Sequence, residues 1–182
     1  MINPDTVTDY RSLFQQINDS HEQKIFAVFR KEHDIKRELP SLIQQTMQKE
    51  HRDLGLITDE PTFFPHLSMI DNLFVCSSIK LGERKAVLRE WASTFDFSMA
   101  DFSQPFEAFS ALDRVKLQLL QLVLSGKAKI ICALDFSTLS VFEKQRLLPL
   151  LKELTAKASI TLWLITADQR IVESPYVDVT LY

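Results

Sequence analysis

A lysine that follows a short apolar run is the first residue in this sequence whose type and position could do chemistry. The run is Lys24–Phe29, which predicts a buried strand, and Lys36 comes shortly after it. A phosphate-binding loop has the pattern Gly-x-x-x-x-Gly-Lys-Ser/Thr directly after such a strand, where the glycines let backbone N–H groups converge on phosphate oxygens. In this register Lys36 keeps the lysine position and is the candidate phosphate ligand.

The other positions of that loop do not fit a phosphate site. Arg30 and Ile35 stand where the two glycines should be, so backbone cannot approach phosphate closely. Glu32 and Asp34 would place carboxylates beside a polyphosphate, and Arg37 removes the hydroxyl that would bind magnesium. We therefore predict a surface loop of mixed charge at this place, residues 30–38, with Lys36 in solvent.

The elements that must position these residues form an alternating α/β pattern. Apolar runs predict strands at residues 24–29, 54–58, 129–134 and 160–165. Their apolar residues do not alternate, which is typical of strands covered on both faces. We expect a mainly parallel sheet with helices on both faces, the strand that ends at Asp135 in its centre, and an edge strand within residues 176–182.

Capping patterns place the helices. Ser110 with Asp113 predicts a helix from about Ser110 to Ser125, and Ser140 with Glu143 predicts one from Ser140 to Lys157 that Pro149 kinks or breaks. A further helix is expected over residues 39–51, with Pro40 in its first turn.

Composition excludes several classes of function. The chain has 182 residues, 46% of them hydrophobic, a formal charge of -3 and a pI of about 5.8, which fits one domain without a nucleic-acid footprint or a polybasic membrane surface. No stretch is apolar enough to insert into a bilayer. Cys76 and Cys132 lie in apolar surroundings and predict two buried thiols in a cytoplasmic protein. The spacing of the four histidines suggests no metal site.

Two stretches together resemble a known family. In the first, Phe109-Ser110-Ala111-Leu112-Asp113 opens a helix, Asp135-Phe136 ends a strand, and Ala167 follows the next strand. In the second, residues 55–72 contain Glu-Pro and Phe-Pro-His-Leu at the offsets of a Q-loop segment. The chain resembles the ATP-binding domain of ABC transporters, and the two stretches cover roughly two-thirds of it.

The resemblance implies that the catalytic residues are missing. Phe136 stands where the family has its general base, Ala167 at the switch histidine and Asp59 at the Q-loop glutamine. No catalytic residue and no cofactor is therefore expected. Weak remnants of nucleotide binding are Lys36, Asp135, which would hold magnesium, and Ser110 of the signature helix.

The leading hypothesis is a pseudo-ATPase that acts through protein contacts as an accessory or regulatory subunit of a transporter. Its partner would be a membrane permease or an intact ATP-binding subunit, so the chain would be cytoplasmic and peripheral to the membrane. One alternative is a weak P-loop NTPase that binds ATP and magnesium through Lys36, Asp135 and Glu60. Another is a soluble α/β domain that resembles the family by coincidence.

The resemblance also locates a partner surface. In the family a small helical subdomain, here residues 66–108, touches the membrane subunit. The segment that retains the family's residues best is residues 60–72. In ABC domains the matching segment lies at the groove that receives the membrane subunit. Phe63, Phe64 and His66 are the candidate contacts, and the alternative is that both phenylalanines only pack inside the protein.

Overall fold

The computed structural model describes residues 10–20, 22–48, 51–60 and 63–182. The chain divides into two units, one formed by Met1–Asp59 with Lys127–Tyr182 and the other by Glu60–Gly126. The predicted helical subdomain, residues 66–108, lies inside the second unit.

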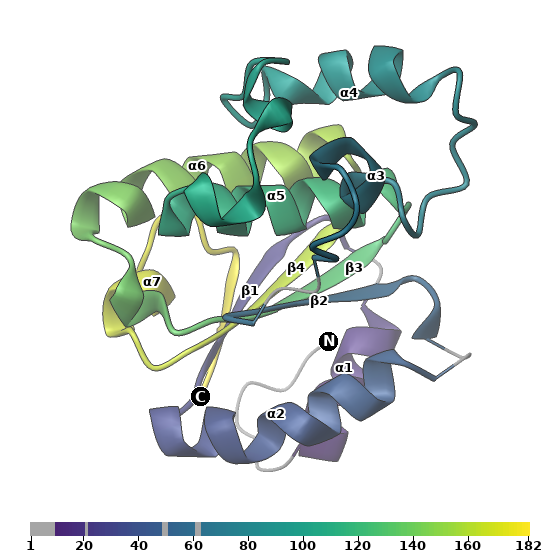
Figure 1. Ribbon diagram of the computed structural model, residues 1–182. Coiled ribbons are helices and arrows are strands. Elements are labelled where there is room, and N and C mark those ends of the chain that lie inside the picture. Colours follow the sequence, from purple (N-terminus) through teal and green to yellow (C-terminus); the bar gives the residue numbers. More distant parts are fainter. Residues whose placement is uncertain (1–9, 21, 49–50, 61–62) are drawn as a thin grey trace. The chain divides into compact units, whose positions relative to one another are not determined.

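The first unit is built on a five-stranded parallel sheet in the order β2-β3-β4-β1-β5 (Figure 1). The strands are β1 (Ile25–Phe29), β2 (Leu54–Thr58), β3 (Lys129–Ala133), β4 (Thr161–Thr166) and β5 (Val179–Leu181). The predicted strands and the edge position of the last one are confirmed. The prediction of a central β3 is wrong, because β1 and β5 both lie beyond β4 and make β4 the middle strand.

Helices cover both faces of this sheet, which confirms the predicted fold class. The helices α1 (Tyr10–Asp19) and α2 (Glu32–Thr46) lie on one face and α6 (Val141–Lys157) on the other (Figure 1). On the first face, apolar side chains of α1 and α2 pack with Phe26 and Trp163, whose rings stack with centroids 4.2 Å apart. Both rings are fully buried, and such a ring contributes about 3–5 kcal/mol relative to alanine.

The segment predicted as a surface loop, residues 30–38, is mostly helix. The helix α2 begins at Glu32, seven positions before the expected start at residue 39, and ends at Thr46. Two charged pairs at helical spacing stabilise its first turns: Glu32 with Lys36, and Asp34 with Arg37. Pro40 consequently lies in the middle of the helix and not in its first turn.

The capped helices follow the prediction more closely. The helix α6 has the Ser140–Glu143 capping box and runs through Pro149 without a break. A turn of 3₁₀ helix, Phe136–Thr138, precedes it, and the short helix α7 (Gln169–Val172) follows β4. Cys132 on β3 is buried, and burial raises the pKa of its thiol to about 12, whereas Cys76 is exposed, contrary to expectation.

The second unit is helical. It contains α3 (Met69–Leu73), α4 (Arg84–Ala92), α5 (Ala111–Leu124) and the 3₁₀ turns Asp101–Ser103 and Phe106–Ala108. Phe97 packs edge-on against Phe102 and Phe109, and these rings form a small buried core. In the described ranges no helix has both the length and the apolar character needed to cross a membrane.

Candidate functional site

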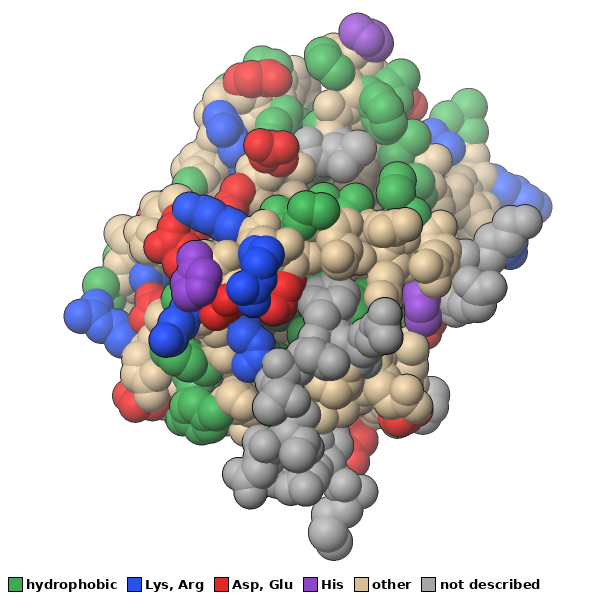
Figure 2. Space-filling view, turned by 90° about the horizontal axis from the view of Figure 1, so that it is seen from below, with side chains coloured by type: hydrophobic (Ala, Val, Ile, Leu, Met, Phe, Trp, Pro, Cys, Tyr) green, Lys and Arg blue, Asp and Glu red, His purple; other side chains and the backbone are tan. Residues whose placement is uncertain are grey.

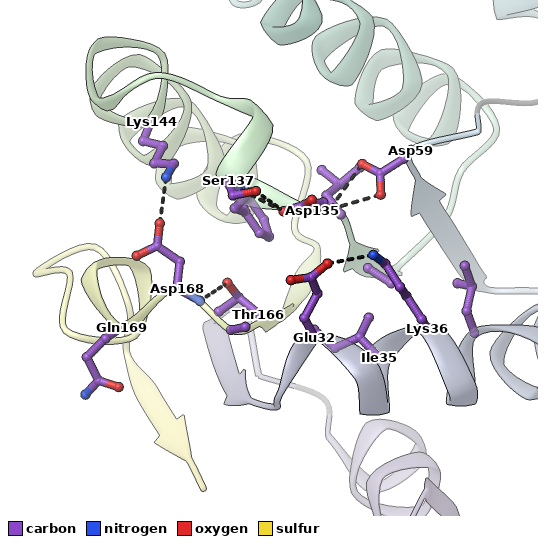
Figure 3. Close-up of a pocket in the computed structure, with 15 residues that line it drawn as sticks. Glu32, Ile35, Lys36, Asp59, Asp135, Ser137, Lys144, Thr166, Asp168 and Gln169 are labelled. Carbon is purple, nitrogen blue, oxygen red and sulfur yellow. Dashed lines mark hydrogen bonds and ion pairs between the residues drawn. The ribbon is translucent and has the colours of Figure 1, made fainter.

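A cavity of about 470 Å³ lies in the first unit, between the first turns of α2 and the carboxyl ends of β3 and β4 (Figure 3). Ligands of open parallel α/β sheets bind at this edge, and small-molecule sites have volumes in this range. Charged side chains gather on its walls, namely Glu32, Lys36, Asp59, Asp135, Lys144 and Asp168. The cavity is therefore the candidate site.

The connection between β1 and α2 does not form a phosphate cradle. Only Arg30 and Lys31 separate the strand from the helix. The N–H of Arg30 donates to the carbonyl of Thr166 at 2.9 Å. The N–H groups of Asp34 and Ile35 both donate to the carbonyl of Lys31, at 3.0 and 3.1 Å. These backbone donors are used inside the fold and do not converge on a phosphate position.

Lys36 points into this cavity from α2 (Figure 3). Its ammonium group lies 2.6 Å from a carboxylate oxygen of Glu32. The hydrogen bond and charge of Glu32 raise the pKa of Lys36, and the carboxylates of Asp135 and Asp59 raise it further. Lys36 therefore has a partner on its own helix. It lies on a helix and not on the predicted loop, but its side chain is 70% exposed, so its predicted position in solvent is confirmed.

Acidic and basic side chains also alternate on the outer surface beside the start of α2 (Figure 2). Arg37 lies 2.8 Å from Asp34, and the ring of His33 lies 3.1 Å from the same carboxylate. Because the charges compensate each other, this surface is not a basic patch that would attract a polyphosphate.

Asp135 lies in the cavity with Lys36, as a nucleotide site would require. Its Oδ1 accepts hydrogen bonds from the N–H and the hydroxyl of Ser137, at 2.9 and 2.6 Å. Its own N–H donates to the carboxylate of Asp59, at 3.0 and 3.1 Å from the two oxygens. Asp135 thus caps the turn that follows β3, and Asp59 fixes that turn to the end of β2.

An ion pair that the sequence did not indicate forms the opposite wall. The ammonium group of Lys144 on α6 lies 2.6 Å from the carboxylate of Asp168, which follows β4 (Figure 3). Burial alone would raise the pKa of Asp168, but Lys144 and the N–H of Arg170 outweigh it and hold that pKa below its usual value. An acid at the carboxyl end of a strand could have drawn attention to Asp168.

Among the lining residues, the carboxylates are the groups that could activate water. The residue after Asp135 is the buried Phe136, and no histidine occurs among the described residues of its lining. Across the described part of the chain, no three histidine, cysteine or acidic residues are placed to hold a metal ion. The carboxylates act here as hydrogen-bond acceptors and ion-pair partners.

The third predicted remnant, Ser110, belongs to the second unit. It is the N-cap of α5, where its hydroxyl accepts the N–H of Asp113 at 3.1 Å and donates to the carboxylate of the same residue at 2.7 Å. Helix capping accounts for this side chain within its unit.

The candidate partner residues lie on a loop of the second unit that Asn72 holds by hydrogen bonds. The side-chain oxygen of the buried Asn72 accepts the N–H of Phe64 at 2.6 Å, and its nitrogen donates to three carbonyls, those of Phe64, Leu67 and Ser68. Phe63 is half-buried and stacks on Phe106 with centroids 4.4 Å apart. Phe64 is 45% exposed, and His66 is exposed. The loop presents Phe64 and His66 but packs Phe63.

No family model and no curated protein matches the sequence. Solved structures do match the fold. The structure of cbiO1 from Clostridium perfringens, part of the ABC transporter complex cbiONQ, has a TM-score of 0.68 at 15% identity, over 86% of this chain and 72% of that one. The dimeric bacterial ABC transporter cassette MJ0796 has a TM-score of 0.64 at 13% identity, over 82% and 77%.

A metal-chelate type ABC transporter in an inward-facing conformation is similar as well. It has a TM-score of 0.63 at 16% identity, over 86% of this chain and 67% of that one. At such identities the likeness shows the fold alone. The chain has the fold of ABC transporter ATP-binding cassettes, as the resemblance of its motifs led us to expect.

Proposed function

We propose that this chain is an accessory or regulatory subunit of an ABC-type transporter that neither binds nor hydrolyses ATP and acts through protein contacts. One observation carries the proposal: the N–H groups of Arg30, Asp34 and Ile35 donate to carbonyls of the protein itself. A phosphate loop depends on such groups being directed at the ligand.

Electrostatics supports the same conclusion. Glu32 forms an ion pair with the ammonium group of Lys36. The cavity lining contains four carboxylates and only two lysines. A nucleotide phosphate would enter a region of net negative charge, and the N–H groups of Arg30, Asp34 and Ile35 are not directed at it. The buried Phe136 cannot act as a general base for water.

The proposed partner is a membrane permease or an intact ATP-binding subunit. Among the similar structures, cbiO1 is part of a transporter complex and MJ0796 is dimeric. The loop held by Asn72 supports a contact role, since an ordered loop with an exposed aromatic side chain loses little entropy on binding. Such a partner would hold the chain at the cytoplasmic side of a membrane.

Calorimetric titration of the purified protein with ATP and magnesium tests the proposal. We expect a Kd weaker than about 1 mM, equivalent to less than about 4 kcal/mol of binding free energy. The ATP-binding cassette MJ0796, whose structure has also been solved with bound ADP and Pi, is the positive control under the same conditions. A micromolar Kd would instead support a weak NTPase that uses Lys36 and Asp135.

A further inference from the structure

The charges that line the cavity between α2, β3 and β4 favour a cation. The lining contains the carboxylates of Glu32, Asp59, Asp135 and Asp168 and the ammonium groups of Lys36 and Lys144, so its formal charge is negative by two. Each lysine already lies 2.6 Å from one carboxylate, Lys36 from Glu32 and Lys144 from Asp168. A further positive charge would bring the lining closer to neutrality.

Lys36 lines the cavity with a side chain that is 70% exposed. Its partner Glu32 raises its pKa most, and the carboxylates of Asp135 and Asp59 raise it further. Acidic groups outnumber basic ones in the lining, and this charge balance disfavours a phosphate.

The other walls of the cavity are apolar. Ile35 and Leu39 line it from α2, and Leu134 and Phe136 line it from the end of β3. A bare metal ion does not suit these walls, and in the described residues no three suitable side chains converge on one point. The volume of about 470 Å³ fits a small organic molecule.

We propose that this cavity binds a small organic cation, a primary ammonium group carried on an apolar body. The ammonium group donates to Oδ2 of Asp135, since both hydrogen bonds from Ser137 go to Oδ1. The apolar body packs against Ile35, Leu39 and Phe136. The cavity thus lies where ligands of parallel α/β folds usually bind, at the carboxyl ends of the strands, but it binds a cation and not an anionic nucleotide.

Titration calorimetry with 2-phenylethylamine and with 2-phenylethanol tests this proposal, because the two probes have nearly the same shape and differ in charge. We expect the amine to bind at least about tenfold more tightly than the alcohol, the difference expected of a charge-assisted hydrogen bond. Equal affinity of the two probes, or no binding of the amine, would overturn the proposal.

Two variants locate the binding. Asp135→Asn should weaken amine binding about tenfold, whereas Glu153→Gln, which changes the net charge equally on the exposed side of α6, should not. Ala167→Trp fills the cavity from an exposed position without altering a carboxylate and should abolish binding. If Glu153→Gln weakens binding as much as Asp135→Asn, or if Ala167→Trp leaves it intact, the amine binds elsewhere and the proposal fails.

This inference is independent of the proposed transporter role. Failure to bind the amine leaves the expected weakness of ATP binding untouched, and tight ATP binding would be seen in a separate titration.

Discussion

The carboxylate of Asp59 accepts the backbone N–H of Asp135, with the nitrogen 3.1 and 3.0 Å from its two oxygens. This contact joins the ends of two neighbouring strands, β2 and β3, at the edge where the cavity opens. It is a hydrogen bond between a charged acceptor and a neutral donor at a partly exposed position, so its net contribution to stability should be modest.

Replacing Asp59 measures this contribution. Asp59→Ala removes the acceptor and should lower the free energy of unfolding by about 1 kcal/mol, whereas Asp59→Asn keeps a side-chain oxygen and should lower it less. Denaturant unfolding followed by circular dichroism gives both values. Equal losses for the two variants would show that the charge of Asp59 matters and not its position as acceptor.

Phe63 and Phe64 should respond differently to the same substitution. Phe63→Glu removes the ring stacked on Phe106 and should lower the Tm by about 5 °C, because roughly 2 kcal/mol of packing is lost. Phe64→Glu changes an exposed ring and should leave the Tm within about 1 °C. Thermal unfolding of the two variants side by side measures the difference.

The same variants test the partner surface. Under the proposed function, the unaltered chain co-purifies with a membrane permease of an ABC-type transporter, and Phe64→Glu abolishes this co-purification. Leu81→Glu is the matched control, because Leu81 is an exposed apolar residue of the same unit at 77% exposure. Undiminished co-purification of Phe64→Glu, or an equal loss with Leu81→Glu, would rule out this loop as the docking site.

Pro40 lies inside α2 and is exposed, so its replacement should stabilise the protein. Proline at this position cannot donate to the carbonyl of Lys36, and alanine restores the donor without loss of buried surface. We expect Pro40→Ala to raise the free energy of unfolding by about 2 kcal/mol, after the greater freedom of the unfolded chain is subtracted. Denaturant unfolding measures it, with the half-buried Pro149→Ala of α6 for comparison. A destabilised Pro40→Ala would mean that the fold requires the bend that proline imposes.

Asp178 should make stability depend on pH in the acid range. Burial would raise its pKa, but the N–H of Ile25 and the ammonium group of Lys152 outweigh this effect and hold that pKa below its usual value. Because the pKa of Asp178 is lower in the folded state, its ionised form stabilises the fold at a pH above its pKa in the unfolded state. This stabilisation is lost as the pH falls through its pKa in the folded state.

We therefore expect Asp178→Asn to be less stable than the natural protein by about 1 kcal/mol at pH 7, and the difference to vanish as the pH falls through the folded pKa of Asp178. Unfolding free energies measured from pH 7 to pH 2 give the comparison. A stability difference that stays constant over this range would show that the charge of Asp178 does not contribute.

The strands and capped helices could be predicted because their evidence is local. Each of the four long strands is a continuous apolar run, and Ser110 and Ser140 carry their capping partners three residues further on. The start of α2 was missed because residues 30–37 were judged as a phosphate loop. Opposite charges three and four residues apart are typical of a helix, and the pairs Glu32–Lys36 and Asp34–Arg37 have this spacing, so the helix could have been recognised from the sequence.

The cavity was harder to predict because its walls come from distant parts of the sequence. Lys36 and Asp135 were named as remnants of a nucleotide site, but nothing local shows that Asp59 holds Asp135. Lys144 and Asp168 meet only because α6 and β4 are packed in the same unit. Order along the sheet set a further limit, since no local pattern reveals that β4 and not β3 is the middle strand.

The position of β1 has a consequence for synthesis of the chain. Both neighbours of β1 in the sheet, β4 and β5, come from the last part of the sequence, and the second unit is translated in between. While the ribosome makes the helical unit, β1 has neither of its hydrogen-bonding partners. Ile25, Phe26 and Val28, which are buried in the folded protein, then lack the neighbouring strands that cover them. Such an unpaired apolar strand is prone to aggregate. Recombinant yield should therefore depend on chaperone capacity and rise when translation is slowed by low temperature.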